Sequence, residues 1–273
     1  MTHTAIVSTV RNGSAHLAEM LESVLAQTHQ DWSMLVIDDG STDETPEILS
    51  AYAQRDGRIG WRRSEAWGRG HALNAALNQV GGELIANIDA DDYWLPHRLA
   101  GGVEALTGRP ELALVCTRHQ TFTRSEDISA ILAARSGDEM KFQPVDVTRE
   151  CLYRNPVNHS SVLMRRAPVE AVSGYDASRR SQFDYDLWAR MAMAGHRLGR
   201  IEDVLVLKRV HAGQSFEAGA HRDYVRSSLE IQKRCIRHLD GGLPAQAFVL
   251  FRSLWGEIPR PARMWARRIL GRG

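Results

Sequence analysis

Two groups of carboxylates stand out in this sequence, because side chains of this type at this spacing can hold a metal ion. They are Asp38, Asp39 and Asp43 in the first group and Asp89, Asp91 and Asp92 in the second. Carboxylates packed together repel one another unless a cation or hydrogen-bond donors offset their charge. Mg²⁺ and Mn²⁺ bind one or two carboxylates and complete their shell with water and phosphate oxygens. The pattern therefore favours a divalent metal beside a nucleoside diphosphate.

The same residues also suit ordinary turns, and the sequence leaves this alternative open. The run Asp-Asp-Gly-Ser-Thr-Asp over 38–43 is typical of a turn and a helix N-cap, and Asp91 and Asp92 can cap a helix after Pro96. A calcium loop of the EF-hand type is excluded, because its spacing of acidic residues and its distal glutamate are missing.

Strands and helices must alternate to place both groups at one edge of a sheet, and the sequence predicts that they do. Short β-branched runs indicate buried strands at 5–10, 33–37 and 83–88, with a further strand at 58–62. Helices are expected after Ser14, from Thr45-Pro46 and over 71–80. The expected fold class is α/β, a Rossmann-like, doubly wound, mostly parallel sheet with helices on both faces. Its strand ends form the expected binding crevice.

Beyond Pro110 the pattern is less regular and predicts an extension that completes the same domain. Strands are expected at 112–116 and 158–164, a helix at 185–194 and a loop over 125–146. The resulting boundaries are a domain over 1–215 and an irregular, helical, basic C-terminal extension over 216–273. Within the domain, a nucleotide-binding half runs to about 110 and an acceptor half covers 111–215.

Composition excludes several function classes. The 273 residues include 34 Lys and Arg against 33 Asp and Glu, a formal charge of +1, so no overall field favours nucleic acid as a partner. Cys116, Cys151 and Cys235 are too far apart for a zinc site and too few for a disulfide framework. They predict buried, reduced thiols in a cytoplasmic protein. Neither a signal peptide nor a run of about 18 apolar residues is found, so no secreted or membrane-spanning protein is expected.

Several motifs occur in an order and spacing that resemble one enzyme family. They are Thr9-x-x-Asn12, Ser23-Val-Leu-Ala-Gln-Thr28, Val36-Ile-Asp-Asp-Gly-Ser-Thr-Asp43, Gly82-Glu-Leu-Ile-Ala-Asn-Ile-Asp-Ala-Asp-Asp92 and Asp184-Tyr-Asp-Leu-Trp-Ala-Arg190. From about residue 3 to about residue 215 the chain resembles the inverting glycosyltransferases of family two, which have the GT-A fold.

The resemblance implies roles for individual residues. Thr9 and Asp39 match positions that hold the nucleotide base. Asp89 and Asp91 match the family's Asp-x-Asp element, in which the first carboxylate meets the ribose and the second the metal. Asp92 lies next to them, toward the donor sugar. His211, in Lys208-Arg-Val-His-Ala-Gly-Gln-Ser215, matches a histidine that can approach the metal or the diphosphate. The implied cofactor is Mn²⁺ or Mg²⁺.

The catalytic base implied by the resemblance is Asp184. Inversion is a single in-line displacement, in which one carboxylate accepts the proton of the acceptor hydroxyl. Asp186 competes for this role, but residues two apart on a helix face different ways, so only one of them can point into the crevice. We expect that residue to be Asp184. The alternative, in which both carboxylates cap the helix that begins near Tyr185, stays open.

Three positions depart from the family pattern. Arg11 stands where an aromatic residue stacks on the base, and a guanidinium can also stack there. Leu73 stands where an arginine meets the diphosphate, and Arg69 or His71 can substitute for it. Phe183 replaces a glutamate beside Asp184.

The C-terminal residues 248–273 hold six arginines and one glutamate. Trp255, Trp265, Ile269 and Leu270 are interleaved with them, which is typical of an amphipathic helix at a membrane interface. Peripheral contact with the inner face of the membrane is one expectation. Packing on the domain and formation of a homodimer are the alternatives.

The sequence thus predicts a metal-dependent, inverting glycosyltransferase of bacterial surface-polysaccharide assembly. Its donor is a nucleoside diphosphate sugar, with UDP as the expected nucleotide, and its acceptor a hydroxyl of a glycan or lipid-linked molecule. A catalytically silent nucleotide-sugar-binding or scaffold protein is the alternative that Phe183 and Leu73 favour. A sugar-1-phosphate nucleotidyltransferase is disfavoured, because Arg11-Asn12-Gly13 is too short for its phosphate loop.

Overall fold

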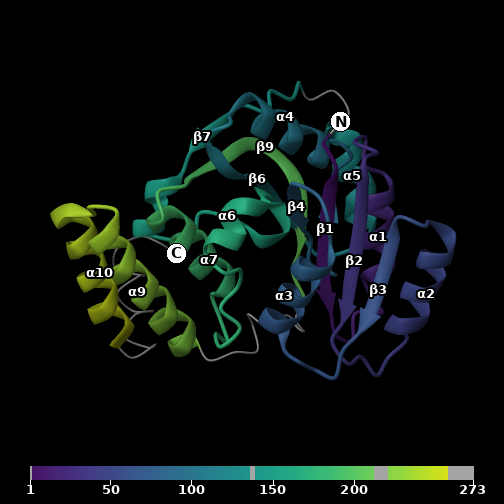
Figure 1. The fold of residues 1–273 in the computed structure, drawn as a ribbon, viewed down its shortest axis with the longest axis horizontal. Coiled ribbons are helices and arrows are strands. Elements are labelled where there is room, and N and C mark those ends of the chain that lie inside the picture. The colour runs from purple at the N-terminus through teal and green to yellow at the C-terminus, as the bar shows by residue number, and fades with distance from the viewer. Residues whose placement is uncertain (1, 136–138, 212–220, 258–273) are drawn as a thin grey trace.

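Residues 2–135, 139–211 and 221–257 are described by the structure, a computed structural model. The strands are β1 (Thr4–Val10), β2 (Trp32–Asp38), β3 (Ile59–Arg63), β4 (Leu84–Asn87), β5 (Tyr93–Trp94), β6 (Leu112–Phe122), β7 (Pro144–Asp146), β8 (Leu163–Arg165) and β9 (Arg197–Arg209). They form one nine-stranded sheet in the order β3-β2-β1-β4-β8-β6-β9-β5, with β7 paired to β9 (Figure 1). The strands β1 to β4 are parallel to one another, whereas β8 joins β4 and β6 in antiparallel pairs.

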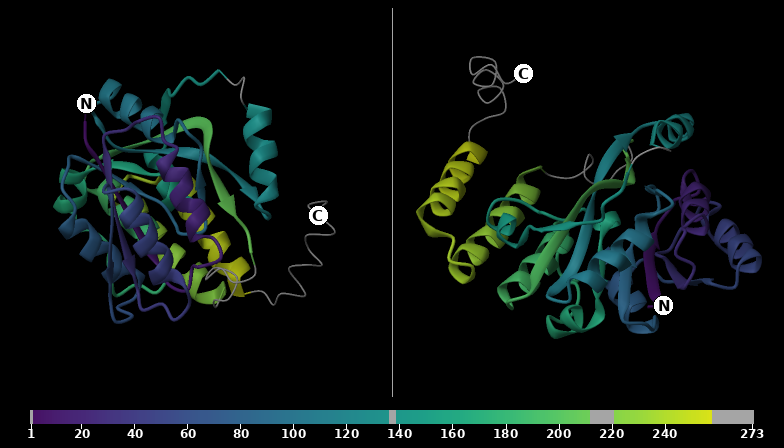
Figure 2. Two further views of the ribbon diagram at one scale, coloured as in Figure 1. Left: turned by 90° about the vertical axis from the view of Figure 1, so that its right-hand side faces the viewer. Right: turned by 90° about the horizontal axis from the view of Figure 1, so that it is seen from above.

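Helices cover both faces of this sheet. They are α1 (Leu17–Leu25), α2 (Thr45–Arg55), α3 (Arg69–Gln79), α4 (Arg98–Gly108), α5 (Glu126–Arg135), α6 (Arg166–Ala171), α7 (Phe183–Met193), α9 (His221–His238) and α10 (Gly242–Glu257). Two short 3₁₀ turns lie at η1 (Thr148–Leu152) and η2 (His159–Ser161). In Figures 1 and 2, α9 and α10 lie at the end of the molecule opposite α2.

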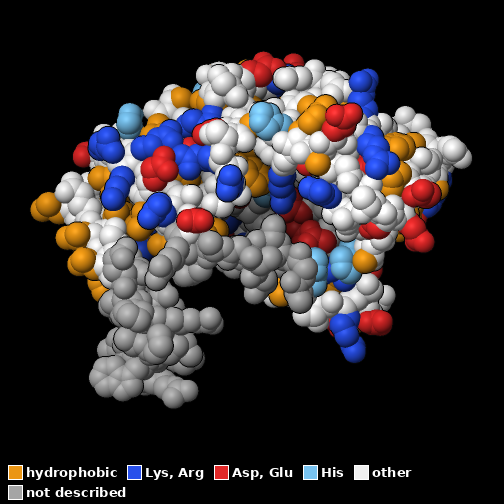
Figure 3. All heavy atoms as spheres, turned by 90° about the horizontal axis from the view of Figure 1, so that it is seen from below, with side chains coloured by type: hydrophobic (Ala, Val, Ile, Leu, Met, Phe, Trp, Pro, Cys, Tyr) orange, Lys and Arg blue, Asp and Glu red, His pale blue; other side chains and the backbone are white. Residues whose placement is uncertain are grey.

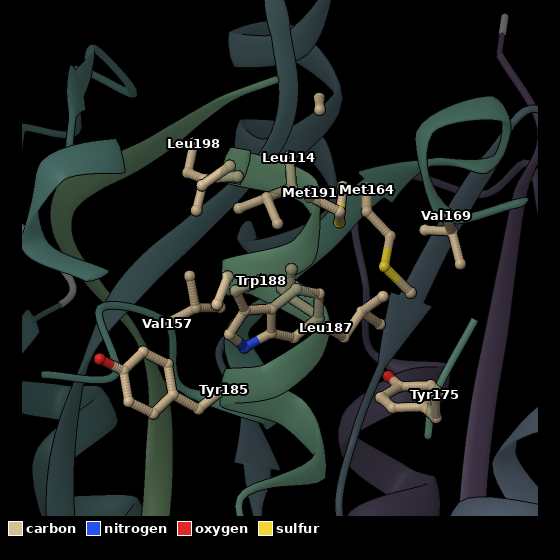
Figure 4. Close-up of a cluster of buried hydrophobic side chains, with 14 of the residues drawn as sticks. Leu114, Val157, Met164, Val169, Tyr175, Tyr185, Leu187, Trp188, Met191 and Leu198 are labelled. Atoms are coloured by element: carbon tan, nitrogen blue, oxygen red, sulfur yellow. The ribbon is translucent and has the colours of Figure 1, made fainter. Parts of the chain in front are cut away.

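Two large apolar cores lie on the two faces of the sheet, because neighbouring residues of a strand point to opposite sides. Ile6 and Val36 pack with residues of α1 and α4, whereas Val7 and Ile37 pack with residues of α3 and α7. Trp188 of α7 is fully buried in the second core and lies among the side chains labelled in Figure 4. The predicted α/β class with helices on both faces is confirmed.

Two sequence predictions in the second half were wrong. Residues 125–146 were expected to form a loop, but they contain α5 and β7. Ile128, Ile131 and Leu132 of α5 pack with Phe122 and Leu207, and this small apolar contact compensates for ordering a polar segment.

The strand expected over 158–164 is also shorter than predicted, because β8 covers only its end. The Asn158 side chain accepts a hydrogen bond from the Ser160 N–H and thereby stabilises η2 in place of extended backbone. All three cysteines are buried, as expected. Among the helices that the structure describes, none is long and apolar enough to cross a bilayer.

Candidate active site

The loop after β1 is joined by hydrogen bonds to the loop after β2. Asn12 N–H donates to Ser41 Oγ over 2.8 Å, and Ser14 N–H donates to Asp43 Oδ2 over 3.0 Å. Asp43 Oδ1 also accepts from the Thr45 hydroxyl and from the Thr45 N–H at the start of α2. Burial acts to raise the pKa of Asp43, but the hydrogen bonds from Thr45 and Ser14 outweigh it and lower that pKa to about 2. For Asp43, the turn interpretation of the sequence is therefore correct, whereas the N-cap residue of α2 is Glu44.

The other two acidic residues of the first group are also held by hydrogen bonds. Asp38 is fully buried and binds a backbone N–H of its own turn. Asp39 accepts from the Ser64 hydroxyl at 2.6 Å and from the N–H groups of Trp67 and Gly68 at 2.7 and 2.9 Å. Asp39 thus orders the segment that leads into α3. The Trp67 side chain on this segment is 50% exposed.

The remaining residues predicted for the nucleotide lie along the same edge. Thr9 is half-buried near the end of β1, and Arg11 and His71 are exposed. A Cβ added at Gly13 would lie 3.9 Å from Ala90 Cβ, so the loop after β1 lies beside the second acidic group.

The second acidic group follows β4 directly and is tightly clustered. Each of Asp89, Asp91 and Asp92 offers a carboxylate oxygen, and these oxygens lie within 4.8 Å of one another. Figure 3 shows acidic side chains gathered in a hollow of the surface, with histidine side chains at its edge. Asp91 and Asp92 do not cap α4, which begins with His97 as its N-cap residue and without a side-chain cap. The cap interpretation is wrong for this pair, although Ala90 and Asp91 do lie in a turn.

Asp89 is oriented by an arginine and a histidine. It forms an ion pair with Arg69 of α3, and its Oδ1 lies 2.9 Å from His159 Nδ1. The other ring nitrogen of His159 lies 3.1 Å from the Tyr175 hydroxyl, which fixes the plane of the imidazole. Burial acts to raise the pKa of Asp89, but Arg69 and His159 outweigh it and lower that pKa well below its usual range. Asp89 is therefore a fixed, ionised carboxylate.

Asp92 is the most deeply buried member of the cluster. It accepts hydrogen bonds from the Ser160 hydroxyl and from the Arg209 N–H, the latter over 3.0 Å. Burial raises the pKa of Asp92 well above its usual value, and the charges of Asp89 and Asp91 raise it further. A carboxyl in this position ionises readily only when a positive charge is added nearby.

Asp91 lies on the open side of the cluster, with its side chain 28% exposed. Its Oδ2 is 3.1 Å from Nε2 of His211, and its backbone carbonyl accepts a hydrogen bond from Arg209 Nε. The His16 ring lies 5.1 Å from the His211 ring, centroid to centroid. Burial lowers the pKa of His16, and the neighbouring Arg209 and His211 lower it further. The two imidazoles thus border the open side of the cluster at Asp91.

These residues fit a divalent cation on their chemistry. Three oxygen donors lie close together, an imidazole contacts one of them, and burial and the charges of Asp89 and Asp91, which raise the pKa of Asp92, are effects that a cation would offset. Oxygen donors with a nearby imidazole suit Mg²⁺ or Mn²⁺.

Asp184 and Asp186, the two candidates for the base, have different surroundings. Asp184 lies in the first turn of α7, is partly exposed, and accepts a hydrogen bond from Asn155 Nδ2 over 2.9 Å. The α7 N-cap residue is Gln182, and it forms no side-chain cap, so neither aspartate serves as the N-cap. Asp186 is 1% exposed and lies within 3.1 Å of Arg179, Arg190 and Arg234. Asp186 therefore neutralises three partly buried arginines.

We expect Asp186→Asn to lower the free energy of unfolding by about 3 kcal/mol, because three guanidinium groups lose their shared counter-charge in a buried site. Urea denaturation followed by circular dichroism measures this. Asp176→Asn is the matched control, since Asp176 contacts the same Arg179 at 3.5 Å with a side chain that is 41% exposed. Equal effects of the two exchanges would contradict a structural role for Asp186.

Arg69 connects the acidic cluster with Asp184. Burial acts to lower the pKa of the Arg69 guanidinium, but three nearby carboxylates outweigh it and raise that pKa, namely Asp89, Asp184 and Asp91. The guanidinium also lies over the ring of Phe183, 5.1 Å from its centroid. The ends of β4, α3 and α7 therefore meet at one place, and the predicted metal and base residues surround it.

Several residues of this site were not predicted. They are Asn155, His159, Ser160, Tyr175 and His16. His159 and Ser160 lie in η2, where the sequence predicted a strand over 158–164, and Asn155 lies before that segment. The only available signal was the polar run Asn158-His-Ser-Ser161, which is unusual for the interior of a strand.

Comparison with known proteins agrees with this geometry. The model of the family described as glycosyl transferase family 2 matches residues 5–170. The chain belongs to glycosyl transferase family 2. Its relatives include the uncharacterized glycosyltransferase RP339 of Rickettsia prowazekii, 24% identical over 77% of this chain and 65% of that protein. The family 2 chain therefore spans about two thirds of that relative's length. The amylovoran biosynthesis glycosyltransferase AmsE of Erwinia amylovora is 25% identical over 80% of this chain and 79% of that protein.

Solved structures share the fold of this family 2 chain. S. aureus TarS 1–349, crystallised in complex with UDP-GlcNAc, superposes with a TM-score of 0.68 at 16% identity, over 86% of this chain and 66% of that one. The mannosyltransferase PcManGT of Pyrobaculum calidifontis, in complex with GDP-Man and Mn²⁺, superposes with a TM-score of 0.61 at 19% identity. The superposition covers 97% of this chain and 83% of that one. The expected family and GT-A fold are confirmed.

Proposed function

We propose that this protein transfers a sugar from a nucleoside diphosphate sugar, with UDP as the preferred nucleotide, to an acceptor hydroxyl with inversion at the anomeric carbon. The observation that carries the proposal is the meeting of Asp89, Asp91 and Asp184 around Arg69. An acidic cluster and a separate carboxylate thus interact with one guanidinium. The solved structures of the same fold with UDP-GlcNAc and with GDP-Man and Mn²⁺ support a donor of this class.

In this proposal one group of residues binds the diphosphate of the donor, and Asp184 acts on the acceptor hydroxyl. Asp91, with Asp89, Asp92 and His211, would hold Mn²⁺ or Mg²⁺, which when bound supplies positive charge to the departing diphosphate. Arg69 is placed to bind the diphosphate from the protein side. Its position on α3 also accounts for Leu73, which is buried in the core four residues later.

Asp184 acts on the acceptor as the general base. Its carboxylate accepts the proton of the acceptor hydroxyl while that oxygen forms a bond to the anomeric carbon and the bond from this carbon to the diphosphate breaks. Asn155 holds one oxygen of Asp184, which leaves the other available for the hydroxyl. One carboxylate is enough for a displacement in a single step. Thr9, Arg11 and Asp39, near the end of β1 and β2, are proposed to bind the nucleoside.

The experiment that tests this function measures release of UDP and GDP from a panel of nucleotide sugars, with and without Mn²⁺, in the presence of candidate glycan acceptors. Metal-dependent release that requires an acceptor supports the proposal, and the anomeric configuration of the product, measured by NMR, tests inversion. Metal-dependent donor binding without any turnover or hydrolysis would favour the silent binding protein. The surface-polysaccharide role is supported by the relation to AmsE, whose name places it in amylovoran biosynthesis.

His159 provides a further test, because it contacts the Asp89 carboxylate directly. We expect His159→Ala to lower kcat/KM for the donor about 10- to 100-fold, since a carboxylate loses the partner that fixes its orientation. His238→Ala, at an exposed position of α9, is the matched control and should change kcat/KM for the donor less than twofold. Unaltered donor kinetics in His159→Ala would mean that Arg69 alone orients Asp89.

A further inference from the structure

Ser160, a residue of η2, bonds to two members of the acidic cluster at once. Its hydroxyl accepts a hydrogen bond from the Asp89 N–H over 3.1 Å and donates one to Asp92 Oδ2. Ser160 is fully buried, so neither bond is exposed to water. A serine hydroxyl has a single proton to donate, and here the carboxylate receives it. The hydroxyl therefore ties the backbone at the first residue of the cluster to the carboxylate of its last residue.

The backbone of Ser160 is held as well, by the indole of Trp94. Trp94 Nε1 donates a hydrogen bond to the Ser160 carbonyl over 2.6 Å, and Trp94 follows Asp92 by two residues in the chain. The segment 89–94 is thus attached to Ser160 through both the side chain and the backbone of this residue. Because the two attachments lie on different parts of Ser160, they fix its orientation as well as its position.

A buried arginine keeps the Trp94 ring in place. The Arg98 guanidinium lies over this ring, 4.2 Å from its centroid, and Arg98 Nη2 donates to the carbonyl of Val162. Arg98 is buried, and its Nε and Nη1 have no hydrogen-bond partner among the residues that the structure describes. A buried cation is costly unless its surroundings compensate it. The indole ring and the Val162 carbonyl supply this compensation, and the same two contacts join Trp94 to the chain just after η2.

We propose that Ser160 is a positioning residue, which sets the spacing of Asp89 and Asp92 for a divalent cation and is itself held by Trp94. This inference rests on the cation site of the proposed function. Asp92 Oδ1 accepts from the Arg209 N–H and Asp92 Oδ2 from the Ser160 hydroxyl, so both oxygens are fixed. Each of them retains a second lone pair for a cation. Partners behind a metal-binding carboxylate orient it and thereby raise its affinity for the metal.

Fixed spacing of the carboxylates also favours small cations over large ones. Mg²⁺ needs oxygen ligands at about 2.0–2.1 Å in near-octahedral geometry, whereas Ca²⁺ takes them at about 2.3–2.6 Å in a flexible shell. Carboxylates that Ser160 holds cannot spread freely to suit the larger ion. We therefore expect the cluster to prefer Mn²⁺ and Mg²⁺ to Ca²⁺, and we expect this preference to depend on the Ser160 hydroxyl.

The test is binding of Mn²⁺ and of Ca²⁺ to the full-length protein, followed by calorimetry with and without UDP, so that no turnover is required. We expect Ser160→Ala to weaken Mn²⁺ binding about 10- to 100-fold and to lower the preference for Mn²⁺ over Ca²⁺ at least about threefold. Ser161→Ala is the matched control, because Ser161 is also buried in η2 but its hydroxyl donates to the Asn158 carbonyl over 2.9 Å. It should change Mn²⁺ affinity less than about twofold.

A second pair of variants tests the part of Trp94. Trp94→Phe removes the indole N–H but keeps an aromatic ring for Arg98, and it should weaken Mn²⁺ binding about threefold or more, because Ser160 loses the bond to its carbonyl. Trp32→Phe is the matched control. Trp32 is buried beneath Arg58, 3.9 Å from the ring centroid, and its Nε1 has no hydrogen-bond partner in the described part of the chain. This exchange should leave Mn²⁺ binding unchanged.

The outcomes distinguish this inference from the proposed function. If wild-type protein binds Mn²⁺ and Ser160→Ala binds it as tightly, or if Ser160→Ala and Ser161→Ala weaken binding equally, the positioning role is rejected and the cation site remains. Equal Mn²⁺ affinities of Trp94→Phe and Trp32→Phe reject the part of Trp94. If wild-type protein binds no Mn²⁺ with or without UDP, the cation site of the proposed function fails first. Circular dichroism checks folding, and the tryptophan pair decides if Ser160→Ala does not fold.

Discussion

Asp91→Ala is expected to abolish metal-stimulated sugar transfer and to lower kcat/KM for the donor by about 10³-fold or more. Asp91 lies on the open side of the cluster, where its Oδ2 contacts His211 and its backbone is held by Arg209. The exchange removes a carboxylate from the proposed cation site without opening a cavity in the core, because the side chain is partly exposed. Steady-state kinetics over a Mn²⁺ titration measures the effect.

Binding of Mn²⁺ itself, followed by calorimetry, shows whether the loss has the proposed cause. Asp91→Ala should weaken Mn²⁺ binding and leave the urea midpoint close to that of the wild type. Asp223→Ala removes an exposed carboxylate from the distant α9 and should alter neither property. Full activity of Asp91→Ala at saturating Mn²⁺ would show that the cluster does not serve the metal.

The strands and helices of the first half were predictable because their signals are local. Each buried strand is a short β-branched run, and each helix over the sheet repeats apolar residues every three or four positions, as α1 does with Leu17, Met20, Leu21 and Val24. Parallel strands then place their carboxyl ends on one edge, so the position of Asp89 and Asp91 followed from topology. The sequence could not separate binding carboxylates from structural ones, because Asp39 and Asp43 differ only in the partners that the fold brings to them.

The hydrogen bonds that orient the site residues could not be predicted, because they join residues far apart in the chain. His159 contacts Asp89 across 70 residues and Tyr175 contacts Asn87 across 88. No periodicity in the sequence encodes such contacts. The helix α5 was missed for a different reason, since only Ile128, Ile131 and Leu132 of its residues pack inward, among alanines and charged residues that give little contrast.

The departures from the family pattern have a structural explanation at this site. Phe183 lies under the Arg69 guanidinium and meets the rings of His159 and Tyr175 edge-on, with centroids 5.8 and 5.9 Å away. A glutamate here would pair with Arg69 and compete with Asp89 for it. The aromatic ring holds the guanidinium without adding a second negative charge, so the ion pair between Arg69 and Asp89 is kept. Phe183 is therefore compatible with an active enzyme.

Asp184→Asn is expected to reduce kcat by about 10²- to 10⁴-fold while the donor KM changes less than about twofold, because the amide cannot accept the proton of the acceptor hydroxyl. The exchange preserves shape, and the new side chain can still accept the hydrogen bond that Asn155 donates to Asp184. Rates of UDP release with acceptor present, together with calorimetric donor binding, measure the two properties separately.

The effect expected of Asp184→Asn differs from the effects expected of exchanges at Asp186 and at the proposed metal residue Asp91. Asp186→Asn should weaken the fold, since three partly buried arginines lose its charge, and its remaining folded fraction should turn over normally. Asp91→Ala should lose Mn²⁺ binding, which Asp184→Asn should keep. In donor hydrolysis water takes the place of the acceptor and gives its proton to the same base, so hydrolysis and transfer should fall together in Asp184→Asn, whereas donor binding should not. If Asp184→Asn instead transfers sugar at the wild-type rate, the proton must go to another group, and the assignment of this aspartate is wrong.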